Sequence, residues 1–409
     1  MYGPFLTRSR NVDTAWRTIV STVLDKGTEV YTERKNQKTL ECLSAIVHLS
    51  DWRTGSITPQ NYIGLSPEVI EQQYWPQYST SERGEHTYTY GWCMKKRFGF
   101  NQTQHVVDTL KRGEKTAFAQ FWNPIVDSKS PDPPCIDIVA FQRSNGKINL
   151  IEYIRSNDIA RAWPEDVSGS YAVFLTEVAA NFGGASARGD ILTMMGSAHV
   201  YDTAIQGIKE RFQSSYTLSN PKPMENTSAL LGPIIQIVGE GEKCSTVANS
   251  IAERYSHVLE EDSSSLYVCL NVQNKKLKEE SAASSETAET TGKLAEALEQ
   301  YIGKDDNGEQ QTINQVEWAS AKAKSTPESR RIVLTPNNPS RREYSINPVI
   351  IQFLIREKNL HTVAMYTDRG VDRVDRDFED LLEISRKVIG RKGNIKLGQV
   401  IMMLAPISL

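Results

Sequence analysis

The feature that most constrains this chain is a pattern that occurs twice. Residues 132–158, "DPPCIDIVAFQRSNGKINLIEYIRSND", and residues 347–370, "NPVIIQFLIREKNLHTVAMYTDRG", both alternate as a β-hairpin does. In the first, "SNGK" supplies the turn. Upstream, "KTAFAQFWNP" from Lys115 matches "RRIVLTPNNP" from Arg330 at an offset of 215 residues, ending in the same Asn-Pro. Matches in this order indicate two copies of one structural unit.

The segments after the two hairpins also correspond. After the first, "YAVFLTEVAANFGG" (171–184) predicts a buried helix closed by glycine, and "GDILTMMGSAHVY" (189–201) predicts a strand. "DTAIQGIKERF" (202–212) predicts a further helix. After the second, "FEDLLEISRKVIG" (378–390) predicts a helix and "GQVIMMLAPISL" (398–409) a strand. Each copy therefore has the same order of elements.

We predict an α/β (α+β) fold of two domains, 1–225 and 226–409, each a mixed β-sheet packed with helices. The polar segment 274–300, rich in Ser, Glu and Thr, has few large apolar side chains until its end. Such a segment buries too little apolar surface to offset the cost of ordering. We expect a mobile loop over about residues 274–297, followed by a helix.

Composition narrows the partners and the compartment. The chain is 39% hydrophobic and 24% charged with a net charge of −3, which is typical of a soluble protein without bulk attraction to nucleic acid. No run approaches the ~20 apolar residues of a membrane span. The five cysteines are odd in number and lack metal-like spacing, which favours reduced thiols in a cytoplasmic protein.

The first copy carries a set of reactive and polar residues. Cys135 follows two prolines, and the returning strand ends in "RSND" with Arg155 and Asp158. His199 and Tyr201 stand two residues apart, so they share one face of the next strand. Each feature also has a purely structural explanation. Cys135 could be a buried thiol, Arg155 and Asp158 could form a salt bridge, and His199 could be a structural histidine.

Taken together, their order and spacing resemble the thymidylate synthase family. The resemblance is clear from Cys135 to Tyr201 and weaker over the first hundred residues. It identifies Arg34 in "TERK" with the phosphate-loop arginine, Glu71 in "EQQYW" with the active-site glutamate, and Tyr90 in "YGW" with the active-site tyrosine.

The resemblance implies a chemistry for these residues. The Cys135 thiolate would add to C6 of a pyrimidine nucleoside 5′-monophosphate, and C5 would take a one-carbon unit from 5,10-methylenetetrahydrofolate. Arg155 would lower the pKa of the thiol and, with Ser156, bind the phosphate. His199 and Tyr201 would hydrogen-bond the sugar 3′-hydroxyl, and Asp158 would bind the pterin. Glu71 would order water and protons at the base.

The resemblance also assigns a role to the second copy. In the family, a symmetric dimer forms each phosphate site with two adjacent arginines of the opposite subunit. Here "PESRRIVLTPNN", with Arg330 and Arg331, occurs only in the second copy, which has Val349 at the place of the cysteine. The first copy thus lacks the arginine pair and the second lacks the cysteine. This complementary loss predicts a monomer whose two units pair sheet to sheet as an internal pseudo-dimer. The alternative is that the two arginines form a solvated strand edge.

Base preference depends on one position. Counting from Arg155 places Asp166 where family members that read uracil have asparagine, whereas counting back from Tyr171 places Val167 there. A carboxylate only accepts hydrogen bonds and therefore suits the cytosine amine. The family's cytosine-specific hydroxymethylases carry the same exchange.

Glu165 stands where a phenylalanine normally lines the folate site, which favours a wetter site and quenching by water. We expect 5-hydroxymethylation of dCMP or CMP. The alternatives are a thymidylate synthase or nucleotide 5-methyltransferase, and a nucleotide-binding homologue without catalysis.

Overall fold

The computed structural model divides the chain into two compact units. The first comprises Met1–Phe121 and Pro134–Ala229, and the second Trp122–Pro133 and Leu230–Leu409. Arg34, Val349 and the expected loop at 274–297 lie outside the described residues. The structure describes residues 4–408 except 33–35, 51–58, 60–61, 214–229, 239–241, 255–264, 273–300, 308, 326–328, 335–349, 357–358, 371–373 and 390–395.

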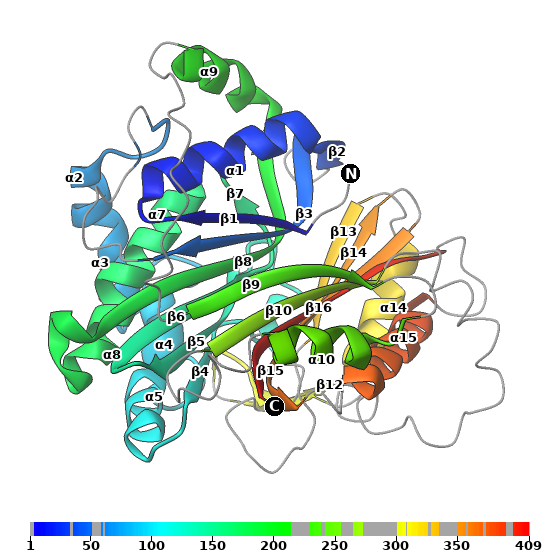
Figure 1. Ribbon diagram of the computed structural model, residues 1–409. Coiled ribbons are helices and arrows are strands. Elements are labelled where there is room, and N and C mark those ends of the chain that lie inside the picture. Colours follow the sequence, from blue (N-terminus) through cyan, green and yellow to red (C-terminus); the bar gives the residue numbers. More distant parts are fainter. Residues whose placement is uncertain are drawn as a thin grey trace. The chain divides into compact units, whose positions relative to one another are not determined.

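The first unit is built on an eight-stranded mixed sheet with the order β1-β3-β8-β6-β5-β4, to which β2 and β7 are added beside β3 and β8. Helix α1 packs along β1 and β3 (Figure 1). The elements of this unit are β1 Phe5–Ser9, α1 Val12–Lys26, β2 Thr28–Thr32, β3 Gln37–Leu49, α2 Pro67–Val69, η3 Ile70–Tyr74, α3 Trp75–Ser79, α4 Tyr90–Lys95, α5 Gln102–Lys111, β4 Thr116–Gln120, β5 Ile136–Ser144, β6 Lys147–Ile154, β7 Asn157–Asp158, α7 Ala162–Gly169, η4 Ser170–Leu175, α8 Thr176–Ala179, η5 Ala180–Phe182, η6 Gly184–Ala187, β8 Arg188–Tyr201 and α9 Asp202–Gln213.

The first hairpin forms as predicted. Strands β5 and β6 pair antiparallel from Ile136↔Ile154 to Ser144↔Lys147. Asn145 and Gly146 form the two-residue loop with φ values of 51° and 67°. Positive φ at both positions is the requirement of the type I′ turn, which Asn-Gly meets at low steric cost. The strand and helix predicted over 189–212 are also confirmed, as β8 and α9.

The helix predicted from Tyr171 is confirmed, but it is not regular. Helix α7 continues directly into a π-helical turn, η4, and then into α8. A π-turn accommodates one additional residue within an α-helix. The chain leaves the helical segment at Gly183, whose φ of 118° favours glycine.

The main core of the first unit lies between its sheet and these helices. Leu150 and Ile154 of β6 and Met195 of β8 pack in one cluster with Trp163 and Phe174 from the helical segment. Side chains alternate faces along a strand, so the next residues project to the opposite face. There, register aligns an apolar row of buried residues across four strands: Ile46, Met194, Tyr153 and Ile138.

The second unit contains a six-stranded sheet in the order β13-β14-β15-β16-β10-β9 and a two-stranded sheet of β11 and β12. The hairpin, helix and strand predicted after residue 347 are confirmed as β14–β15, α15 and β16. The elements are α6 Pro124–Asp127, β9 Leu230–Val238, α10 Cys244–Arg254, β10 Ser265–Val272, β11 Tyr301–Lys304, β12 Gln310–Ile313, α14 Gln315–Ser325, β13 Ser329–Leu334, β14 Ile350–Arg356, β15 Asn359–Gly370, α15 Val374–Ile389 and β16 Lys396–Ser408.

The six-stranded sheet repeats the topology of the first unit. Its order from β13 to β9 corresponds to β4-β5-β6-β8-β3-β1. The strand directions agree as well, because β13/β14, β14/β15 and β16/β10 are antiparallel whereas β15/β16 and β10/β9 are parallel. The same directions occur in β4/β5, β5/β6, β8/β3, β6/β8 and β3/β1. One topology in both units supports the internal repeat seen in the sequence.

The fit of α7 against α3 can be tested with two helix glycines. A Cβ at Gly169 would lie 2.6 Å from the buried Tyr78 ring, whereas a Cβ at Gly207 of α9 meets nothing within 4 Å. Gly169→Ala should lower the free energy of unfolding by about 1–3 kcal/mol through overpacking. Gly207→Ala should leave it unchanged or raise it by up to ~1 kcal/mol. Urea titration of both variants measures this, and equal effects would contradict the packing.

Candidate active site

The candidate thiol lies at the start of the first hairpin. The backbone N–H of Arg155 donates to the carbonyl of Cys135 at 3.0 Å. Arg155 Nε donates to the Pro134 carbonyl at 2.8 Å and lies 3.9 Å from a carboxylate oxygen of Asp137. The hairpin thus holds the Arg155 guanidinium on the carbonyl of Pro134, the residue just before the half-buried thiol of Cys135.

The charges around Arg155 favour its ionised form. Burial lowers the pKa of Arg155, but the negative charges of Cys135 and Asp137 outweigh this, so the pKa is raised above its ordinary value. The attraction is mutual, so a fixed guanidinium favours the thiolate form of a neighbouring cysteine. The geometry therefore suits nucleophilic chemistry at Cys135.

Tyr88 and Tyr90 complete the surroundings of the thiol. Tyr90 begins α4, which Thr89 caps, and its hydroxyl accepts from the Ile136 N–H at 3.4 Å. Burial is the main cause that raises the pKa of both tyrosines, and the nearby Cys135 contributes. Both phenols therefore stay neutral at ordinary pH. The structure brings Tyr90 to the candidate nucleophile, as expected from the sequence.

The candidate sugar and pterin residues lie on adjacent strands. The short β7 pairs parallel with β8 and aligns Asp158 with His199. The rings of His199 and Tyr201 pack edge to face, with centroids 5.0 Å apart. Asp158 is partly exposed, and one of its oxygens accepts from the Ala160 N–H at 3.1 Å. Ser156 lies buried just before β7.

Asp166 of α7 is held by three donors from three elements. Its Oδ1 accepts from the hydroxyls of Tyr74 at 2.7 Å and Tyr78 at 3.1 Å, and its Oδ2 accepts from Asn157 Nδ2 at 3.0 Å. Burial raises the pKa of Asp166 to about 6, although these donors oppose the rise. Asp166 is therefore mostly ionised at neutral pH. Val167, the alternative position, is buried in the apolar core.

The two ways of counting lead to different surroundings. Counting forward from Arg155 reaches Asp166 in the polar cluster, whereas counting back from Tyr171 reaches Val167 in the apolar core. The π-turn Ser170–Leu175 lies between Asp166 and the point where the α-helix resumes at Thr176. Such a turn can accommodate one additional residue, so the spacing on its C-terminal side is the less reliable of the two.

Sequence reasoning missed the partners of Asp166. Tyr74 and Tyr78 stand four residues apart, which is the spacing of one helix face, and Asn157 lies within the quoted "RSND". Tyr78 also packs against Tyr90, with centroids 4.8 Å apart. A continuous set of aromatic rings therefore connects the Asp166 carboxylate with the surroundings of Cys135.

Two further carboxyl groups lie close to Asp166. Glu152 of β6 is fully buried and accepts from Thr193 Oγ1 at 3.3 Å, and burial raises its pKa to about 8. Glu165 accepts from the Tyr62 hydroxyl at 2.8 Å and the Leu65 N–H at 3.1 Å. Burial raises the pKa of Glu165 as well. No pattern in the sequence singles out Glu152.

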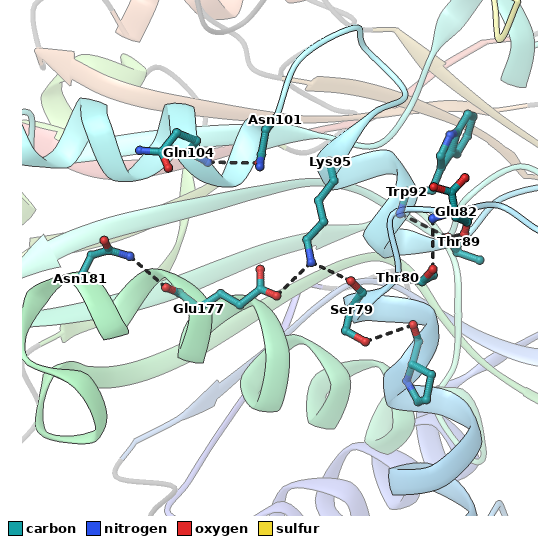
Figure 2. A network of polar contacts seen from close by, with 11 residues as sticks. Ser79, Thr80, Glu82, Thr89, Trp92, Lys95, Asn101, Gln104, Glu177 and Asn181 are labelled. Atoms are coloured by element: carbon teal, nitrogen blue, oxygen red, sulfur yellow. Dashed lines mark hydrogen bonds and ion pairs between the residues drawn. The ribbon is translucent and has the colours of Figure 1, made fainter.

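A polar network supports the helices that carry the tyrosines. Lys95 of α4 donates to the Ser79 carbonyl at 2.7 Å and forms an ion pair with Glu177 of α8 at 3.0 Å (Figure 2). Thr89 caps α4 and donates to the Glu82 carbonyl at 2.9 Å. These contacts tie α3, α4 and α8 together, and so they fix where Tyr78 and Tyr90 point.

Three further expected residues lie on η3 and β13. Glu71 is exposed on η3. Arg330 and Arg331 lie in β13 of the second unit, aligned with Ile355 and Leu354 of β14. Their side chains and Arg34 are outside the description. In the described parts of the chain, no helix is long and apolar enough to cross a membrane.

Comparison with known proteins finds similarity to one family. Residues 66–226 match the thymidylate synthase family model. A "putative thymidylate synthase" of Methanothermobacter marburgensis is 27% identical over 211 residues, which cover 48% of this chain and 92% of the relative. That of Methanococcoides burtonii is 29% identical over 201 residues, 48% and 89% of the two chains. The thymidylate synthase of Varicella-zoster virus is 32% identical over 127 residues, 31% and 40%.

The buried Glu152 carboxyl predicts a pH-dependent stability difference. Its pKa rises from 4.5 to about 8 on folding, so the folded state binds more protons than the unfolded state between these values. Stability is therefore lost as pH rises through this window. Glu152→Gln cannot ionise, so its free energy of unfolding relative to wild type should increase by at most about 1.4 kcal/mol per pH unit there.

Urea unfolding at several pH values between about 4.5 and 8 measures this difference. Glu85→Gln, at an exposed position of the first unit, is the matched control and should show no such trend. A Glu152→Gln difference that stays constant with pH would contradict a buried neutral carboxyl group.

Proposed function

The first unit of this chain belongs to the thymidylate synthase superfamily, and we propose that it 5-hydroxymethylates a cytosine nucleotide, dCMP or CMP. The family transfers a one-carbon unit to C5 of a pyrimidine nucleoside monophosphate and takes it from 5,10-methylenetetrahydrofolate. The observation that carries the cytosine assignment is Asp166, a buried carboxylate held by three donors.

Cys135 is the proposed nucleophile. Its Sγ would form a bond to C6 of the pyrimidine ring, which raises the electron density at C5, and the bond would break again to release the product. Arg155, fixed on the Pro134 carbonyl, favours the thiolate before the attack. The neutral Tyr90 hydroxyl, already bonded to the Ile136 N–H, would help to order groups around the ring.

Asp166 would select the base. Tyr74, Tyr78 and Asn157 all donate to it, so the carboxylate is held in its acceptor form. An acceptor pairs with the exocyclic amine of cytosine, whereas it faces O4 of uracil unfavourably. An unmatched buried acceptor costs ~1–3 kcal/mol, which corresponds to roughly a 5- to 150-fold preference.

Asp158 fits the binding of the folate donor, whereas Glu165 departs from the family at the folate site. Asp158 is a partly exposed carboxylate aligned with His199, so it could accept from pterin N–H groups beside the nucleotide. Glu165 instead binds Tyr62 and Leu65, where the family has an aromatic lining. When bound, the folate supplies a one-carbon unit at the oxidation level of formaldehyde.

The polar character around Glu165 supports a hydroxymethyl product. A hydroxymethyl group keeps the oxidation level of the one-carbon unit and needs only water, whereas a methyl group needs a hydride. A carboxylate with a hydrogen-bonded tyrosine holds water better than a phenylalanine does. A nucleotide 5-methyltransferase is the alternative, and product mass distinguishes the two.

The second unit would provide phosphate ligands. Arg155 and Ser156 would bind the phosphate from the first unit, and Arg330 and Arg331 would add two charge-assisted contacts as a partner subunit does in the family. The topology that the two units share supports this proposal.

The assignment can be tested with 5-tritiated dCMP and dUMP in the presence of 5,10-methylenetetrahydrofolate. Wild type should release tritium from dCMP in preference to dUMP and give a product with the mass of a hydroxymethyl group. Cys135→Ala should lose at least ~1000-fold in release, because the bond to C6 cannot form. Asp166→Asn should shift the preference toward dUMP by roughly tenfold or more.

Cys93→Ala is the matched control, because Cys93 is a fully buried thiol on α4. It should change tritium release little. Equal release by the Cys135→Ala variant and wild type would remove the nucleophile assignment, and release from neither base would remove the proposed reaction.

Arg330→Ala and Arg331→Ala should each weaken dCMP binding by about 10- to 100-fold, since a charge-assisted contact contributes ~1.5–3 kcal/mol. Isothermal titration of each variant measures this affinity. Lys322→Ala, in α14 of the same unit, is a control for charge alone. Unchanged affinity in both arginine variants would show that the phosphate is bound without them.

A further inference from the structure

A carboxyl group occupies an apolar layer of the first unit. Glu152 projects from β6 on the face that packs against the helices, between the core residues Leu150 and Ile154. It has no exposed surface. A carboxyl group at such a position costs stability unless it stays neutral or is well paired. Its presence in the core therefore calls for a role other than packing.

The contacts of Glu152 are few and polar. One oxygen accepts from Thr193 Oγ1 at 3.3 Å, and the other has no hydrogen-bond partner among the described residues. The buried Ser170 hydroxyl, at the first residue of η4, likewise has no hydrogen bond within the described structure. Both hydroxyls act on Glu152 to oppose the effect of burial on its pKa. A protonated Glu152 can donate toward Ser170 while it accepts from Thr193.

We propose that Glu152 is a positioning residue for Asp166, a neutral acid that leaves the negative charge of this core on the base-reading carboxylate. This inference rests on the proposed function, because it assigns Asp166 to the base. When Glu152 itself ionises, two anions share one buried layer, and their repulsion displaces Asp166 from its donors. Base recognition then has an alkaline limit that is set by Glu152.

The groups that face these two carboxyls support this order of ionisation. Asp166 from α7 and Tyr78 from α3 interact electrostatically with Glu152. Asp166 also faces Glu165, Tyr74, Tyr88 and Tyr90.

Burial raises the pKa of all four tyrosines, so they remain neutral. The pKa of Asp166 is about 6 and that of Glu152 about 8. Between these values Asp166 is ionised and Glu152 is neutral.

The test is the pH dependence of tritium release from 5-tritiated dCMP, measured from about pH 6 to about pH 9.5. Wild type should lose activity above pH 8, the range in which Glu152 ionises. In Glu152→Gln the ratio of the rate at high pH to that at neutral pH should rise by roughly fivefold or more.

Thr193→Val removes a hydrogen-bond donor to the ionised form of Glu152. The pKa of Glu152 should therefore rise, and the alkaline limit should move to higher pH. The surface control Glu85→Gln should keep the wild-type profile. Equal ratios in wild type and Glu152→Gln, or no decline of the wild type at high pH, would overturn the inference.

A direct titration separates this inference from the proposed function. If wild type releases no tritium at any pH, the proposed reaction fails. In that case ¹³C NMR of protein labelled at the glutamate side-chain carboxyl carbon still reads Glu152, as the signal that is missing from Glu152→Gln. A titration of that signal near pH 8 would support the neutral buried acid, and one at the ordinary value near 4.5 would overturn it.

Discussion

The geometry of the site depends on three hydrogen bonds to one carboxylate. Tyr74 and Tyr78 reach Asp166 from η3 and α3, and Asn157 reaches it from β7. Hydrogen bonds to a charged group contribute ~1.5–3 kcal/mol each, more than neutral ones. Because the donors come from separate elements, these bonds fix helix α7 against both the sheet and the preceding helices. The orientation of the Asp166 carboxylate is thus determined by the fold.

The hairpin was readable because its signals are local. Asn145 and Gly146 specify the turn, and alternation specifies the strands on either side. The repeat could be predicted for a different reason. It is found by comparing two segments of the same chain, and this comparison does not depend on estimating any interaction energy. The aligned hairpins predict the order of elements along each unit, whereas the order of the six strands in each sheet is seen only in the structure.

The partners of Asp166 could not be read in this way. Tyr74 and Asp166 are separated by 92 residues, and no local pattern reports a contact of that range. The π-turn at Ser170–Leu175 is equally silent in the sequence, because an inserted residue can be absorbed at several places along a helix. The burial of Glu152 is also not evident from the sequence. A glutamate in a strand is usually solvated, so only the register, which aligns it with Thr193 on the core face, reveals its burial.

The buried Glu152 carboxyl costs stability, and the proposed function gives a reason for its presence in the core. Leucine at position 152 would complete the apolar row between Leu150 and Ile154, and it would remove a group whose pKa burial raises to about 8. A chain selected for stability alone has no reason to keep the acid. In the proposed role, a protonated Glu152 can donate toward Ser170 at the start of the π-turn, which leucine cannot do, and Asp166 is the anion of this layer between the two pKa values. The cost of Glu152 in the core is then linked to the charge that Asp166 presents to the base.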